Sequence, residues 1–329
     1  MPTTTFSDIE PTRLDRRNLL ACSAVGIAIP AALVAAGLPV RTAATQSAGV
    51  AAATPASEGE EMTDTSPRAG YAPVNGLQIY YEIHGEGEPL LLLHGAFGTI
   101  ELWGLILATL AENHQVIAVE FQGHGRTADI DRPLTYEQLV TDTAALMQHL
   151  GIEQADIVGY SLGGIVALGL AIEHPGLVRK LVVAGANYNN DALYPESLAA
   201  IESLTPEMFA GSPPETAYLE VAPNPDAFPT LVAKIVELDR AFGGWREEDL
   251  QAIEAPALVI IGDSDIRPEH AVALFRLLGG GVPGDLVGIP RSRLAILPGT
   301  THVGLVTERA DWLVAMTDEF LSAPMPESQ

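Results

Sequence analysis

The feature that most constrains this 329-residue chain is a change of hydrophobic period around one serine. Residues 156–160 form a short, mostly apolar run typical of a buried strand, whereas residues 162–174 show helical spacing. The sequence G-Y-S-L-G lies between them, at residues 159–163. A turn this tight leaves no room for Cβ atoms two residues before and after Ser161, which explains the glycines. The pattern therefore predicts a strand-turn-helix unit with the Ser161 hydroxyl at the carboxyl end of a sheet.

Strand and helix patterns alternate on both sides of this turn. The other expected strands are residues 89–94, 115–120, 177–184, 257–261 and 293–297, and the other expected helices are residues 103–110, 134–150, 228–242, 269–278 and 310–321. An Asn75-Gly76 pair between two short alternating runs predicts a hairpin at the start. The alternation predicts the α/β class, with a mostly parallel sheet covered by helices on both faces.

Four further short motifs follow the expected strands in a fixed order. They are H-G-A-F-G at residues 94–98, F-Q-G-H-G-R at 121–126, G-D-S-D at 262–265 and P-G-T-T-H at 298–302. Together with the serine turn, this order resembles the α/β-hydrolase family over residues 71–321. The resemblance implies an α/β-hydrolase fold with the chain order nucleophile, acid, base. It also implies a small helical lid at about 186–250, where prolines and acidic residues interrupt the alternation and two or three helices are expected.

A serine hydroxyl is a poor nucleophile at neutral pH, so Ser161 needs a base and the base needs an orienting group. His302 comes after the last expected strand, which suits both the family order and the usual place of sites in α/β sheets. His270 also follows the acid, but only five residues later on an expected helix, from which it could hardly return to that acid. We therefore predict that His302 is the base.

Two aspartates follow the strand at residues 257–261. The family pattern G-x-x-D selects Asp265 as the acid, whereas Asp263 has an alternative role as a turn former. Asp191, after an earlier strand, is a further candidate because some family members place the acid there.

Negative charge on an attacked carbonyl oxygen needs prepositioned amides. By resemblance, these donors are the backbone amides of Ala96 and Leu162. His94 is expected to be a buried histidine that satisfies loop amides. His124 and Arg126 resemble a structural turn of the family, although Arg126 could also touch an anionic substrate.

Residues 1–44 are expected to be an export signal, because Arg16 and Arg17 directly precede an apolar stretch at residues 19–40. This arrangement resembles a twin-arginine leader and predicts a periplasmic or extracellular protein. A retained N-terminal membrane anchor is the alternative, since roughly 20 apolar residues can span a bilayer. Residues 45–70 are expected to be a flexible linker, and residues 71–329 the catalytic domain.

Charge and cysteine usage exclude several classes of partner. Seventeen basic residues against 42 acidic ones give a net charge of −25, which argues against nucleic acid and anionic membrane surfaces. The only cysteine, Cys22, lies in the expected leader, so disulfides and cysteine metal sites are not expected in the processed protein. No metal and no organic cofactor is expected, because the histidines lack ligand spacing. The glycines at residues 279–281 lack the lysine of a phosphate-binding loop and are interpreted as a flexible connection.

The resemblance implies an exported serine hydrolase that acts on a small-molecule ester, with lactones, thioesters and amides as neighbouring substrates. Serine at position 161 argues against the dehalogenase and epoxide-hydrolase branches, which use aspartate as the nucleophile. Three alternatives stay open: a cofactor-free haloperoxidase or perhydrolase, a carbon-carbon bond hydrolase of ring-cleavage products, and a non-catalytic small-molecule binder on the same scaffold. The substrate's identity and the oligomeric state are left open.

Overall fold

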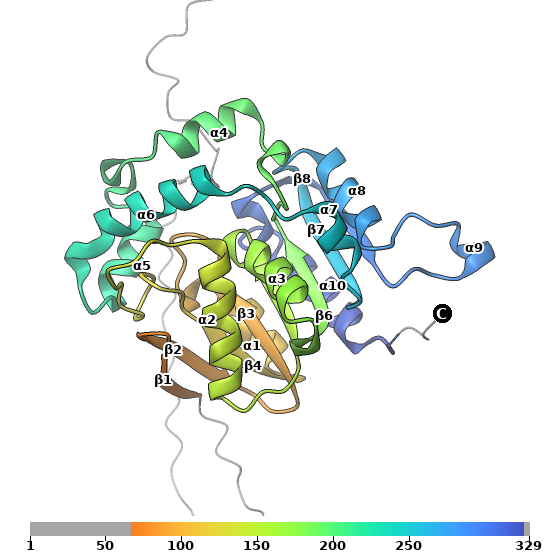
Figure 1. Cartoon of the computed structure of the whole chain (residues 1–329), viewed down its shortest axis with the longest axis horizontal. Helices are drawn as coiled ribbons and strands as arrows, with labels where there is room; N and C mark the ends of the chain where they lie inside the picture. The colour runs from red at the N-terminus through yellow and green to blue at the C-terminus, as the bar shows by residue number, and fades with distance from the viewer. Residues whose placement is uncertain (1–66, 326–329) are drawn as a thin grey trace, which may run out of the picture.

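The computed structural model describes residues 67–325 (Figure 1). The expected export signal at residues 1–44, which contains Cys22, lies outside the described residues, as does the expected linker up to residue 66. Strand β1 begins at Arg68, so the last three residues of the expected linker belong to the sheet. Their small and charged side chains give no strand signal, and pairing with β2, from Arg68 opposite Ile83 onward, decides their conformation.

Within residues 67–325, eight strands form one sheet in the order β1-β2-β4-β3-β5-β6-β7-β8. β2 is antiparallel to β1 and to β4, and the other neighbouring strands are parallel, which confirms the predicted sheet. Asn75 and Gly76 have positive φ angles of 49° and 84°, as a tight hairpin between β1 and β2 requires. The strands are β1 Arg68–Val74, β2 Leu77–His84, β3 Glu88–Leu93, β4 His114–Val119, β5 Ala155–Tyr160, β6 Val178–Ala184, β7 Ala257–Ser264 and β8 Arg293–Thr301.

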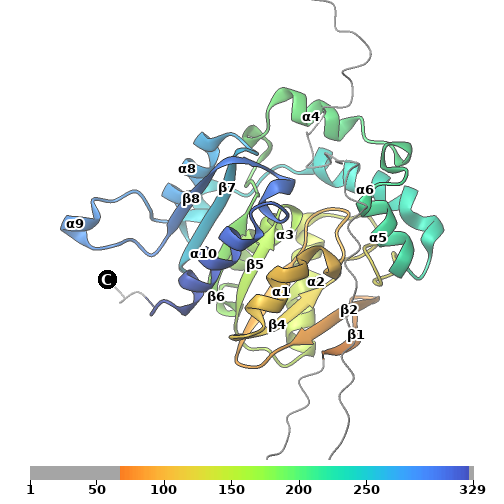
Figure 2. The same ribbon diagram turned by 180° about the vertical axis from the view of Figure 1, so that it is seen from behind.

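Helices cover both faces of the sheet. Figure 1 shows α2 and α3 in front of it, and Figure 2, from behind, shows α1 and α10 on the opposite face. The helices are α1 Gly104–Leu110, α2 Tyr136–His149, α3 Leu162–Glu173, α4 Pro195–Glu202, α5 Pro213–Val221, α6 Phe228–Ala241, α7 Glu247–Gln251, α8 Pro268–Leu277, α9 Gly284–Val287 and α10 Ala310–Ser322. Of these helices, none is long and apolar enough to cross a bilayer.

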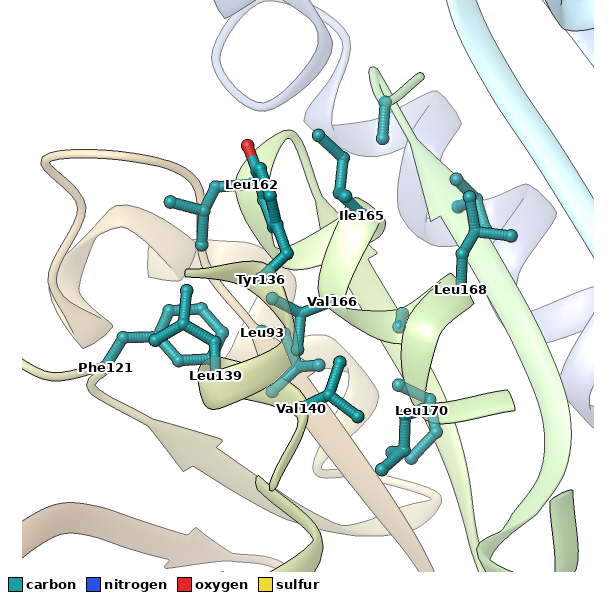
Figure 3. Packing of buried hydrophobic residues seen from close by; sticks show 14 of the residues in the cluster. Leu93, Phe121, Tyr136, Leu139, Val140, Leu162, Ile165, Val166, Leu168 and Leu170 are labelled. Atoms are coloured by element: carbon teal, nitrogen blue, oxygen red, sulfur yellow. The ribbon is translucent and has the colours of Figure 1, made fainter. Parts of the chain in front are cut away.

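The core has two layers because successive side chains of a strand point to opposite faces. Leu91 and Leu93 of β3 belong to the cluster that includes α2 and α3, whereas Leu90 and Leu92 belong to the cluster that includes α1 and α10. All four leucines are fully buried, which explains the continuous apolar run of this strand. Figure 3 shows the first layer, in which Leu93 lies with Leu139 and Val140 of α2 and Val166 of α3.

The segment expected to form the lid connects β6 to β7 and lies over the carboxyl edge of the sheet (Figures 1 and 2). It contains four helices, α4 to α7, where the sequence predicted two or three. Phe228 packs against both Phe209 and Tyr218, and Phe97 of the core packs against Phe209 and Phe228. The aromatic side chains therefore hold this segment on the core.

The last strand is longer than the sequence predicted. β8 continues through Pro298 and Gly299 to Thr301, whereas the expected strand ended at residue 297. The proline and glycine indicated a loop, but pairing of Ser264 with Thr301, beyond an irregularity in the β7–β8 register, extends the strand. The short helix α9, on the connection that follows the glycines at residues 279–281, was also not predicted.

Candidate active site

Ser161 occupies a strained turn between β5 and α3. Its φ and ψ are 54° and −121°, a conformation that residues other than glycine rarely adopt. The flanking glycines are sterically required: a Cβ on Gly159 would lie 2.3 Å from the Gly163 carbonyl oxygen, and a Cβ on Gly163 would lie 2.0 Å from the Leu93 carbonyl oxygen. The steric reason inferred from the sequence therefore matches the geometry of the turn.

Ser161, Asp265 and His302 each come directly after the last residue of a parallel strand, β5, β7 and β8 respectively. Parallel strands end at the same edge of a sheet, so the three side chains meet there. The Ser161 Oγ lies 2.9 Å from the His302 Nε2, and the His302 Nδ1 lies 2.7 Å from the Asp265 Oδ1. The three side chains form one continuous hydrogen-bonded chain, and their catalytic roles stay predictions.

The other candidate acids and the other candidate base lie elsewhere. The Asp263 carboxylate accepts hydrogen bonds from the amides of Gly299 and Thr300, at 2.9 and 3.2 Å, and so fastens β7 to the end of β8. His270 stacks on Tyr188 with ring centroids 4.1 Å apart, and its Nε2 accepts the Tyr188 amide. Asp191 is exposed, and the hydrogen bonds among residues 67–325 do not join it to His302.

The environment of His302 favours its protonated form. Burial by itself lowers the pKa of this imidazole, but the charge of Asp265 and its hydrogen bond outweigh burial and raise the pKa above the ordinary 6.5. The Asp265 side chain is only 2% exposed, whereas that of His302 is 20% exposed. The acid is thus shielded from water while the imidazole remains open to the cavity described below.

The two predicted oxyanion donors lie beside Ser161. Leu162 is the first residue of α3, where backbone amides have no partner within the helix. Ala96 follows Gly95, and a Cβ on Gly95 would lie 3.0 Å from the Cβ of Ser161. The β3–β5 register, with Leu93 opposite Gly159, brings this loop level with the serine. Both donor residues line the same cavity as Ser161.

His94 is buried and structural, as the sequence indicated. Its Nδ1 donates to the Gly95 carbonyl oxygen at 2.7 Å, and its Nε2 accepts the Phe121 amide at 3.3 Å. Burial lowers the pKa of His94 to about 4, which keeps the ring neutral and both bonds intact. Burial also lowers the pKa of His124 to about 3. Neither imidazole lines the cavity beside Ser161.

Arg126 is held by two carboxylates instead of facing the cavity. Its guanidinium donates to Glu120 at 2.8 Å and to Glu101, and it lies over the ring of Tyr80. Glu120 is fully buried and also accepts the amides of Arg126 and Ile100. Arg126 does not line the cavity beside Ser161, so the contact with an anionic substrate that the sequence left open has no support there.

The cavity beside Ser161 is lined by residues that sequence reasoning did not single out. They come from the lid, from the loop after β6 and from α2, and include Asn187, Asn190, Leu198, Ile201, Tyr136 and Asp239. The lid aromatics Phe209, Tyr218 and Phe228 do not line it. One signal was available, because Asp239 lies four residues after Ile235 on the buried face of α6. Within residues 67–325, no group of three His, Cys, Asp or Glu side chains is arranged to hold a metal ion.

The chain matches some curated proteins over less than half of their length and others over nearly all of it. The chain is 35% identical over 113 residues to the "Putative carbamate hydrolase RutD" of Azorhizobium caulinodans, covering 34% of this chain and 43% of that protein. It therefore spans less than half the length of the first curated relatives it matches. It is also 27% identical over 285 residues to the "Non-heme haloperoxidase" of Rhodococcus erythropolis, covering 76% of this chain and 97% of that protein.

Solved structures and a family model cover most of the domain. The serine hydrolase involved in carbazole degradation (CarC enzyme) superposes with a TM-score of 0.62 at 24% identity, covering 78% of this chain and 99% of that one. The enol-lactonase from Burkholderia xenovorans superposes with a TM-score of 0.58 at 22% identity, covering 77% and 100%. These likenesses concern the fold. The model described as "Alpha/beta hydrolase family" matches residues 90–316, and the chain belongs to that family.

Proposed function

We propose that this protein is a serine hydrolase that cleaves a carboxylic ester through an acyl-enzyme on Ser161. The observation that carries the proposal is the unbroken hydrogen-bond chain from the Ser161 hydroxyl through His302 to Asp265. This geometry lets the imidazole accept the serine proton while the carboxylate stabilises the resulting charge.

The cycle follows from that arrangement. His302 takes the Ser161 proton as Oγ attacks the acyl carbon, and the protonated imidazole then gives the proton to the departing alcohol. Water, activated by the neutral imidazole, attacks the acyl-enzyme, and the serine leaves as the acid forms. The Ala96 and Leu162 amides donate to the oxyanion in both halves of the cycle.

The volume of the cavity supports small substrates, and the names of related proteins indicate which further substrate classes to test. The cavity is about 80 Å³ in volume. That is below the roughly 300–1,000 Å³ of typical small-molecule sites, so we expect short acyl groups to fit best. Relatives named as a carbamate hydrolase and as a "Pyrrolizixenacetamide deacetylase" keep carbamates and amides among the substrates to test.

The decisive experiment is a panel of p-nitrophenyl esters of increasing acyl length, from acetate to octanoate, assayed with wild type and Ser161→Ala. We expect the short esters to be cleaved fastest and the variant to lose at least about a thousandfold of the rate. Ser203→Ala, which removes an exposed lid hydroxyl bonded to its own helix, is the matched control and should retain activity. Comparable rates in wild type and Ser161→Ala would refute the proposal.

A fluorophosphonate probe separates an enzyme from a non-catalytic binder on the same scaffold. Wild type should label covalently at Ser161, and Ser161→Ala should not label. A wild-type protein that binds esters but neither labels nor turns them over would favour the binder.

A peroxide-dependent use of the same acyl-enzyme is the second candidate, and the match over 97% of the relative named as a non-heme haloperoxidase favours it. Hydrogen peroxide would replace water, attack the acyl carbon and leave as a peracid while Ser161 regains its proton. Bromination that requires acetate, peroxide and Ser161, and that is faster than ester hydrolysis, would make this candidate the better one.

We also propose that the protein is exported, on the sequence of residues 1–44 alone. The paired arginines before the apolar stretch support a twin-arginine signal, and retention as an N-terminal anchor is the alternative.

A further inference from the structure

The cavity that contains Ser161 also contains a carboxylate for which the proposed reaction has no use. Asp239, on lid helix α6, lines the cavity together with Tyr136, the first residue of α2. The Tyr136 hydroxyl donates to the Asp239 Oδ1 at 3.0 Å. Figure 3 shows Tyr136 directing its hydroxyl toward the end of α3 at which Leu162 and Ile165 lie. The pair therefore faces the same space as the nucleophile.

The position of Asp239 is fixed from two sides. Asn190, in the loop after β6, donates to the Asp239 backbone carbonyl oxygen at 3.2 Å, while the buried Tyr136 holds the side chain. Hydrogen bonds thus hold both the backbone and the carboxylate of Asp239, and a residue held in this way presents a defined binding geometry to a ligand.

The half-buried carboxylate of Asp239 has few partners. Among residues 67–325, its one hydrogen bond is from Tyr136, and no lysine, arginine or histidine forms an ion pair with it; the adjacent Arg240 pairs with Glu237 instead. Asp239 also lies in the last turn of α6, where the helix dipole disfavours negative charge. A partly buried carboxylate in such a position gains free energy from an additional donor or cation.

The charge of Asp239 is retained at neutral pH. Burial raises the pKa of Asp239 to about 6, against the effect of the Tyr136 hydrogen bond, so the group is mostly ionised at pH 7. Apart from His302, the side chains that line the cavity are neutral or acidic. The net charge of −25 adds a long-range attraction for cations.

We propose that Asp239 and Tyr136 form a subsite that selects ester substrates carrying a protonated amine. The inference rests on the proposed hydrolase function and names its substrate class. The ammonium group would donate to the free side of the carboxylate, while Leu198 and Ile201 contact the methylene groups between it and the ester. A purely structural latch between lid and core is the competing role, and it would affect charged and neutral substrates alike.

Two pairs of isosteric esters test the charge without changing shape. The first pair, 2-(dimethylamino)ethyl acetate and 3-methylbutyl acetate, places the ammonium group in the alcohol. The second pair, methyl 4-(dimethylamino)butanoate and methyl 5-methylhexanoate, places it in the acyl group. Binding of each ester to Ser161→Ala protein is measured by calorimetry at pH 7, and hydrolysis of each is measured with wild type.

For at least one pair, we expect the ammonium ester to bind Ser161→Ala at least about tenfold tighter than its neutral isostere, the effect of one charge-assisted hydrogen bond. Adding Asp239→Asn, which keeps the shape and an acceptor for Tyr136, should bring the two affinities to within about twofold. Asp239→Ser is the second variant should the amide fail to fold. Glu237→Gln removes the same charge from an exposed position on α6 and should preserve the preference.

The possible outcomes separate the two proposals. Equal affinities within both pairs, or a preference that survives Asp239→Asn, overturn the subsite even if wild type hydrolyses the esters. A preference that depends on Asp239, in a protein that hydrolyses none of the four esters, supports the subsite and counts against the hydrolase function.

Discussion

The Tyr160 hydroxyl donates a 3.0 Å hydrogen bond to the backbone carbonyl oxygen of His302, and the two rings lie against each other at 5.1 Å. Tyr160 immediately precedes Ser161 in the chain and is 5% exposed. The residue beside the proposed nucleophile thus fixes the backbone of the proposed base, which comes from another strand. Tyr160 is a positioning residue in this arrangement.

Replacing Tyr160 by phenylalanine removes the hydroxyl while keeping the ring. Loss of one hydrogen bond of about 1 kcal/mol should lower kcat by about threefold to tenfold through a less well-placed imidazole, with KM within about twofold. Steady-state kinetics on p-nitrophenyl acetate measures both constants. Tyr218→Phe is the control, because its hydroxyl also donates to a backbone carbonyl oxygen, that of Asn224, away from His302. An equal drop in both variants would show a general effect of losing a buried hydroxyl.

Asp265→Asn should shift the pH profile as well as the rate. Only neutral imidazole can accept the Ser161 proton, so kcat/KM of wild type should fall as pH is lowered through a pKa above 6.5. Without the Asp265 charge, burial remains and lowers the pKa, so the inflection should move to lower pH. The amide also favours the wrong tautomer of His302, which should cost at least about a thousandfold in the pH-independent rate.

The control for that change is Asp263→Asn, two residues earlier. Its carboxylate accepts the Gly299 and Thr300 amides and does not contact His302. We expect a lower melting temperature with the inflection of the pH–rate profile unmoved. An inflection that moves for Asp263→Asn but not for Asp265→Asn would show that Asp263, and not Asp265, is the acid.

Gly163→Ala should destabilise the fold. The new methyl group would lie 2.0 Å from the Leu93 carbonyl oxygen, and a backbone atom cannot move aside as a flexible side chain can. We expect a loss of about 3 kcal/mol in the free energy of unfolding, measured by chemical denaturation. Gly176→Ala is the control, because a Cβ there meets no atom within 4 Å, and it should be close to neutral. An unchanged free energy of unfolding in Gly163→Ala would contradict the steric clash on which this prediction rests.

Replacing Arg16 and Arg17 by lysine preserves the charge of the expected leader but removes the paired arginines. If the leader is of the twin-arginine type, the double variant should remain inside the cell, as shown by fractionation and by mass spectrometry of the amino terminus. Arg13→Lys, a few residues upstream, is the matched control and should be exported normally. Normal export of the double variant would exclude this route.

The α/β class was predictable because its signals are local. The glycines around Ser161 indicate a turn that leaves no space for Cβ atoms, and the four consecutive leucines of β3 indicate a strand buried on both faces. Motif order then pointed to His302 and to Asp265, and the geometry brings both to Ser161. The extension of β8 to Thr301 escaped prediction because it depends on pairing with β7.

By itself the sequence determined the fold class, the serine turn and the order of the candidate residues, since these depend on spacing within short segments. Only the tertiary structure decided that Arg126 is held by carboxylates and that Asp239 shares a cavity with Ser161. Tyr136 and Asp239 are separated by 103 positions in the chain. Residues so far apart carry no periodic signal of their contact, because the packing of the lid on the core brings them together.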